Sequence, residues 1–73
     1  MTYYVQRTNK LTDFYGKDHY GKYTFNKVSK LHHIHYFDTY DEASSQMLTT
    51  YYNCELYHFQ ILPRHTITPN KLG

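Results

Sequence analysis

Hydrophobic and polar residues alternate in several short stretches of this chain, a spacing typical of strands in a half-buried sheet. The alternation runs through residues 2–8 (TYYVQRT), 22–28 (KYTFNKV), 31–37 (LHHIHYF) and 54–62 (CELYHFQIL). Residues 9–21 carry Asn, Asp and Gly at positions that suit turns, so we expect a long connection or the frayed tip of a hairpin there. Pro63 is expected to end the last strand.

A helix is predicted between the third and fourth strands. Thr39 and Glu42 have the spacing of a capping box, in which each side chain accepts a hydrogen bond from a backbone amide at the helix start. Asp41 adds negative charge where the helix dipole favours it. Asn53 is expected to end the helix. Apolar residues at helical spacing form a stripe that can cover a sheet: Ala43, Met47, Leu48 and Tyr51.

The element order β-β-β-α-β predicts an α+β domain with three to four mainly antiparallel strands and one helix packed on one face. Residues 1–64 are expected to form this single domain, and residues 65–73 a C-terminal tail. The alternation assigns these side chains to the face under the helix: Tyr3, Val5, Tyr23, Phe25, Ile34, Tyr36, Tyr57, Phe59 and Ile61. The opposite, open face is expected to carry Tyr4, Gln6, Lys22, Thr24, Asn26, His33, His35, Phe37, Leu56, His58 and Gln60.

Composition changes this picture in two ways. The chain has 73 residues, of which 10 are Tyr and none is Trp. A domain of this length buries only about 60% of the surface of its unfolded chain, so its core is thin and its tyrosine rings are expected to lie at the boundary with solvent. The net charge of +2 is well below the dense basic surface of a dedicated duplex-DNA binder.

Cysteine content and hydropathy predict the compartment. The single Cys54 excludes an intramolecular disulfide and favours a reducing environment. No apolar run approaches the ~18 residues of a transmembrane helix. We therefore expect a cytoplasmic protein that makes no membrane contact.

The histidines are the one local cluster with the chemistry of a metal site. His33 and His35 share a face if residues 31–37 form a strand, and His58 is expected on the same face. These three imidazoles are an alternative zinc site with one open position. The chain has no C-x-x-C or H-E-x-x-H motif, so we prefer imidazoles on a solvated or partner-facing sheet and expect no metal or cofactor.

Catalytic chemistry is not indicated elsewhere. Cys54 opens a predicted strand, whereas activated thiolates favour helix N-termini or cationic neighbours. The carboxylates form no pair whose spacing indicates acid and base roles, and there is no phosphate-binding glycine loop. We expect that the protein is not an enzyme.

The stretch from Phe37 to Leu62 combines a strand ending in Phe, the helix start DTYDEA and a closing strand. This arrangement resembles small phage and prophage accessory proteins of low-GC Gram-positive bacteria, and the Tyr, Asn, Lys and Thr usage is similar to that of such genomes. The resemblance implies a phage-encoded protein in the host cytoplasm. Some of these families bind and inhibit host or defence proteins, as anti-CRISPR proteins do.

Two functions from different classes remain. We favour a non-enzymatic protein-binding module, an inhibitor of a host or defence protein that uses tyrosines as rigid anchors. The alternative is a single-stranded nucleic-acid binder that stacks bases on aromatic rings and neutralises phosphates with lysines. A homodimer through Phe37 and Leu56 is a further expectation. The residues expected to contact the partner are Tyr4, Lys22, His33, His35, Phe37 and His58.

Overall fold

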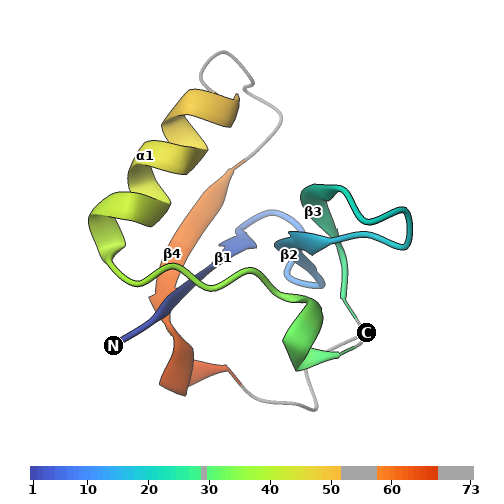
Figure 1. Cartoon of the computed structure of the whole chain (residues 1–73), viewed down its shortest axis with the longest axis horizontal. Coiled ribbons are helices and arrows are strands. Elements are labelled where there is room, and N and C mark those ends of the chain that lie inside the picture. Colours follow the sequence, from blue (N-terminus) through green and yellow to red (C-terminus); the bar gives the residue numbers. More distant parts are fainter. Residues whose placement is uncertain (29, 52–57, 68–73) are drawn as a thin grey trace.

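The computed structural model describes residues 1–28, 30–51 and 58–67. Four strands form one antiparallel sheet in the order β3-β2-β1-β4, and one helix packs against β1 and β4 (Figure 1). The elements in chain order are β1 (Tyr3–Arg7), β2 (Asp13–Lys17), β3 (Tyr23–Lys27), the short 3₁₀ helix η1 (Leu31–His33), α1 (Tyr40–Tyr51), β4 (Phe59–Pro63) and the short 3₁₀ helix η2 (Arg64–Thr66). The predicted α+β class, with one helix on one face of the sheet, is confirmed.

Strand β2 was missed, because it lies inside the segment that we expected to be a connection. Its buried Asp13 and its Gly16 were interpreted as turn residues, but packing requires both. The Asp13 carboxylate pairs with Arg7 at 3.3 Å, so a buried charge is compensated. A side chain at Gly16 would collide with the backbone carbonyl of His33, so glycine permits the close approach of that segment.

The predicted strand at residues 31–37 forms no regular ladder. Its first three residues are η1, and the rest makes isolated bridges to two strands, Ile34 to Gly16 and Phe37 to Tyr3. The His35 amide donates to the Tyr15 carbonyl at 3.0 Å, and Phe37 and Tyr3 exchange two backbone hydrogen bonds of 2.8 Å. The segment therefore joins β1 to β2 instead of extending along one neighbour.

This pairing also reverses the faces that we assigned to the segment. Residues opposite each other in an antiparallel pair share a face, so the bridge to Tyr3 places Phe37 on the helix side. Phe37 packs there with Val5, Tyr15, Phe25, Ala43 and Met47. Ile34 instead packs on the opposite face with Tyr4, Phe14 and Val28.

The face opposite the helix is therefore not open. Tyr4 is 3% exposed, and partly buried side chains pack against the second cluster: Leu62 of β4, Leu31 and Tyr36 from the segment between β3 and α1, and Ile67 after η2. Alternation alone cannot reveal such a cover, because it reports which side chains share a face and not what packs on that face.

The helix prediction is confirmed in its start and its inner stripe. The Glu42 amide donates to the Thr39 hydroxyl at 3.1 Å, as an N-cap requires. The reciprocal hydrogen bond, from the Thr39 amide to the Glu42 carboxylate, is not among the hydrogen bonds of the described residues. Ala43 and Met47 are fully buried, whereas Leu48 is 60% exposed and does not belong to the stripe. The side chain of Tyr51, the predicted stop at Asn53 and the strand residues 54–57 lie outside the described residues.

Candidate functional site

The six predicted contact residues do not share one surface. Tyr4 is buried, and its hydroxyl lies 3.1 Å from that of Thr66. Lys22 is exposed where the β2–β3 connection ends, His33 is exposed in η1, and His58 is exposed before β4. The predicted open-face site is therefore not formed as a continuous patch.

Two of the six, His35 and Phe37, do lie together. Both are on the helix side of the sheet, with ring centroids 4.6 Å apart in an edge-to-face arrangement. Phe37 is 7% exposed, so it offers little area to the homodimer contact that we expected, while Leu56 lies outside the described residues.

No three His, Cys, Asp or Glu side chains in the described ranges are placed to hold a metal ion. His33, His35 and His58 thus form no zinc site in this structure. His33 instead packs edge-to-face on His32, with ring centroids 4.3 Å apart, and His35 packs among aromatic rings.

The rings around His35 form a compact group on β2, β3 and the segment before α1. Tyr15 stacks on Tyr23 and on Phe37, with centroid separations of 6.2 and 6.1 Å. His35 lies edge-on to all three, at 5.1 Å from Tyr23 and 6.0 Å from Tyr15. Aromatic pairs favour these stacked and edge-to-face orientations in addition to burying apolar area, so each ring restrains the orientation of its neighbours.

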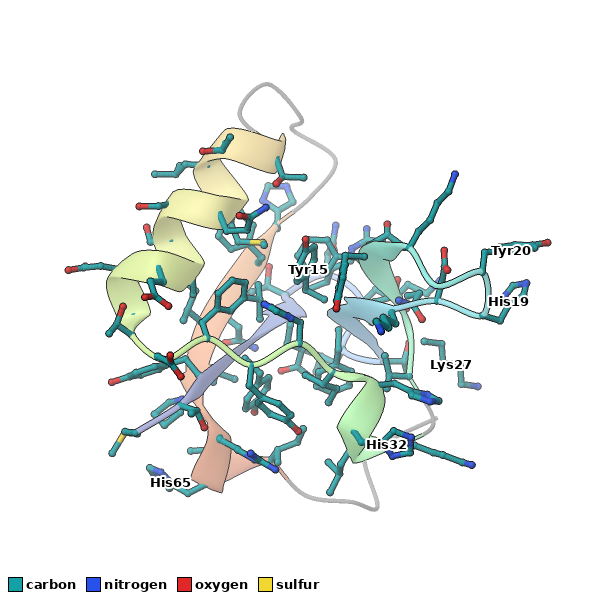
Figure 2. The ribbon with its side chains drawn as sticks, viewed as in Figure 1. Tyr15, His19, Tyr20, Lys27, His32 and His65 are labelled. Atoms are coloured by element: carbon teal, nitrogen blue, oxygen red, sulfur yellow. The ribbon has the colours of Figure 1, made fainter. Side chains whose placement is uncertain are left out.

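Helix α1 forms the second wall of this site. It packs on β1 and β4, and Figure 2 shows Tyr15 in the space between α1 and the β2–β3 hairpin. An open cavity of about 520 Å³ lies along the helix, lined by Phe37, Asp41, Glu42, Ser45, Gln46 and Thr49. Phe37 lines this cavity and also stacks on Tyr15, so it joins the group of rings to the helix wall in one site. We call it the aromatic groove: Tyr15, Tyr23, His35, Phe37 and the five helix residues.

The groove has one acidic and one basic side. The exposed carboxylates of Asp41 and Glu42 belong to the helix wall. Among the rings the charge is basic: the Lys17 ammonium lies 5.7 Å from the centre of the Tyr23 ring, and Tyr23 is 49% exposed. The groove therefore carries both charges, and a partner that is itself mixed in charge can complement them.

Burial shifts the titration of two groups in the groove. Desolvation raises the pKa of Tyr15, and the Gln46 side chain opposes this rise. Desolvation lowers the pKa of His35 below 6.5. His35 is therefore mainly neutral at pH 7, and the charge of the groove comes from its carboxylates and Lys17.

The tip of the β2–β3 hairpin presents a second pair of rings. The Asp18 carboxylate accepts hydrogen bonds from the amides of Tyr20 and Lys22 at 2.8 and 2.9 Å, and Gly21 adopts a positive φ of 82°. Tyr20 is 78% exposed, and its ring lies 4.0 Å from that of His19. Figure 2 shows both side chains at the tip, away from the sheet.

Of the groove residues, sequence reasoning named only His35 and Phe37 as contacts; it placed Tyr23 under the helix and gave no role to Tyr15 or Gln46. The signal for Tyr15 was present as the first of two YGK triplets, one of which is in β2 and the other in the hairpin turn. Once β2 is recognised, Tyr15 lies opposite Phe25 and next to the Lys17–Tyr23 pair, so a cross-strand aromatic group follows. Gln46 carries no comparable signal, because its exposed helix position is typical of any polar residue.

Comparison with protein-family models, curated proteins and solved structures finds no match to this chain. In the part of the chain that the structure describes, α1 is too short and too polar to cross a membrane.

Proposed function

We propose that the chain is a non-enzymatic protein-binding module and that the aromatic groove is its contact surface. The observation that carries this proposal is Tyr23, which is half exposed yet held by stacking on the buried Tyr15 and by the edge of His35. A ring fixed in this way contacts a partner at low entropic cost, and tyrosine is enriched among residues that dominate binding energy.

The charges of the groove favour a protein over a nucleic acid. Asp41 and Glu42 on the helix wall repel a phosphate backbone, while they attract lysine or arginine side chains. We infer a partner segment that places an apolar side chain against Tyr23 and His35 and a basic side chain against the helix start. Inhibition of a host or defence protein, the role that the phage resemblance implies, is the extension of this proposal.

One observation favours the second candidate, single-stranded nucleic-acid binding. The hairpin carries exposed Lys17, Lys22 and Lys27, and its tip presents Tyr20 beside His19. Bases stack on such rings, and lysines neutralise phosphates. Tyr20 and His19 lie at the tip of the hairpin and outside the aromatic groove, so mutation of Tyr20 or of Tyr23 can separate the two functions.

The two exposed tyrosines of the hairpin are a matched pair for the test. The wild-type chain, Tyr23→Ala and Tyr20→Ala are immobilised and exposed to bacterial lysate with and without nuclease, and thermal melting confirms that each variant is folded. We expect one stoichiometric protein to be retained after nuclease by the wild type and by Tyr20→Ala, and to be lost with Tyr23→Ala. Glu42→Lys is expected to weaken the same capture through the charge of the helix wall.

The opposite pattern would reject the proposal. If nuclease abolishes retention, and Tyr20→Ala rather than Tyr23→Ala removes it, the hairpin tip binds nucleic acid. If a folded Tyr23→Ala variant retains the protein as well as the wild type does, the groove is not the contact surface.

A further inference from the structure

A pocket of about 480 Å³ lies on the face of the sheet opposite α1. Its floor is Tyr4 of β1 and Phe14 of β2, both almost completely buried, and Leu62 of β4 and Ile67 after η2 contribute further apolar wall. The volume falls within the ~300–1,000 Å³ of small-molecule sites, which are mostly apolar with a few placed polar groups.

The rim of the pocket is fixed by a buried amide. The Gln6 side chain is 8% exposed and donates to the Leu11 carbonyl at 2.7 Å, which ties the β1–β2 connection to the sheet. Leu11 lines the pocket yet is 58% exposed, so its apolar side chain is available to a bound molecule. The pocket therefore has a preformed floor and one exposed apolar rim residue.

The lining indicates which molecules fit. None of the described side chains that line the pocket is charged, so an ionised ligand would lose its hydration and gain no opposite charge from them. Gln60 donates to the Gln6 side-chain oxygen at 3.1 Å. Its own side-chain oxygen accepts no hydrogen bond from the described residues, and because Gln60 lines the pocket, this oxygen is the acceptor that we infer for a ligand donor.

We propose that this pocket binds a small, uncharged, mainly apolar molecule with one hydrogen-bond donor, such as an aromatic alcohol. The apolar part packs on Phe14, Leu62 and Ile67, and the donor reaches the Gln60 oxygen. The site lies on the other face of the sheet from the aromatic groove and does not depend on the protein-binding proposal.

Three related probes test the chemistry: 2-naphthol, 2-methoxynaphthalene and 2-naphthoate, titrated at pH 7 against methyl-labelled protein and followed by NMR. We expect 2-naphthol to shift the methyl signals of Leu11, Leu62 and Ile67. The methoxy compound lacks the donor and should bind about two- to tenfold more weakly. The carboxylate should bind at least about tenfold more weakly than 2-naphthol because its charge is not compensated.

Leu11 and Leu48 provide a matched pair of variants, since they are similarly exposed on opposite sides of the sheet, at 58% and 60%. Leu11→Ala should weaken 2-naphthol binding several-fold, whereas Leu48→Ala should leave it unchanged. Equal binding of 2-naphthoate, no shift at the three methyl groups, or equal effects of the two variants would each overturn the proposal. Displacement of 2-naphthol by a captured protein partner would assign the pocket to a partner side chain and also overturn it.

Discussion

Gly16→Ala tests the packing that joins the β2–β3 hairpin to the rest of the sheet. The added Cβ would collide with the His33 carbonyl oxygen and lie 2.9 Å from Ile34 Cα and 3.0 Å from the His33 carbonyl carbon. All three are backbone atoms, which cannot rotate away as a side chain can. Residues 33–35 must therefore move off β2, and the 3.0 Å hydrogen bond from His35 to Tyr15 is strained or lost.

The expected cost follows from these contacts. Overpacking costs about 1–3 kcal/mol, and a lost hydrogen bond adds about 1 kcal/mol, so Gly16→Ala should lower the free energy of unfolding by about 2–4 kcal/mol. This is a large fraction of the roughly 5 kcal/mol available to a small domain. Urea unfolding measures the loss, and the amide shifts of Ile34 and His35 should change most.

Gly21→Ala is the control, because it measures the cost of an unfavourable backbone conformation in the absence of any steric collision. A Cβ at Gly21 meets no atom within 4 Å, but the residue has a φ of 82°. Alanine there should cost roughly 1–2 kcal/mol through conformation alone, with amide shifts confined to the turn. Without a collision, alanine would stabilise the protein slightly, because it lowers the conformational entropy of the unfolded chain. A Gly16→Ala variant as stable as the wild type would therefore refute the close approach of residues 33 and 34 to β2.

Other expectations concern the helix and His35. Met47→Ala should lower the free energy of unfolding, measured in urea, by about 2–5 kcal/mol because Met47 is fully buried in the cluster with Val5. Leu48→Ala should change it by under roughly 0.5 kcal/mol because Leu48 is exposed. The reverse order would mean that α1 faces the other way. Thr39→Ala should cost about 0.5–2 kcal/mol by removing the N-cap, and Thr39→Ser should restore most of it. Because burial lowers the pKa of His35, the unfolded chain binds the proton more tightly, so stability should fall as the pH drops below about 6.5. Unfolding of wild type and His35→Phe at pH 7.5 and 5.5 checks this, and an equal pH dependence of the two would contradict it.

The sequence predicted elements well where local chemistry and packing agree. Thr39 caps the helix that it was expected to cap, and Ala43 and Met47 face the sheet. Strand β2 was missed because Asp and Gly are typical turn residues. Here Asp13 is present for an ion pair with Arg7, and Gly16 for the close approach of His33. A local sequence pattern does not show whether an Asp or Gly is present for a turn or for a long-range contact.

The candidate site was predicted in part. His35 and Phe37 were both named, but on the face opposite to the one they occupy, since residues 34–37 pair with β1 and β2 in a register that alternation does not specify. Tyr4 was expected on an open face and is buried under residues that follow β3 and β4. Which segment covers a sheet is a property of the whole chain, so no local pattern predicts it.

The pairing of the first strand with the last has a consequence for synthesis of the chain. Strand β1 pairs with β4 from Tyr3↔Pro63 to Arg7↔Phe59, whereas its register with β2 includes only Gln6↔Phe14. A ribosome adds roughly 5–20 residues per second, so β1 waits for seconds before its main partner is made. During that time the β2–β3 hairpin can form from local contacts, but β1 can join it only through its short register with β2 and lacks its longer ladder with β4. Folding of the whole sheet therefore waits until β4 has been synthesised and has left the ribosome.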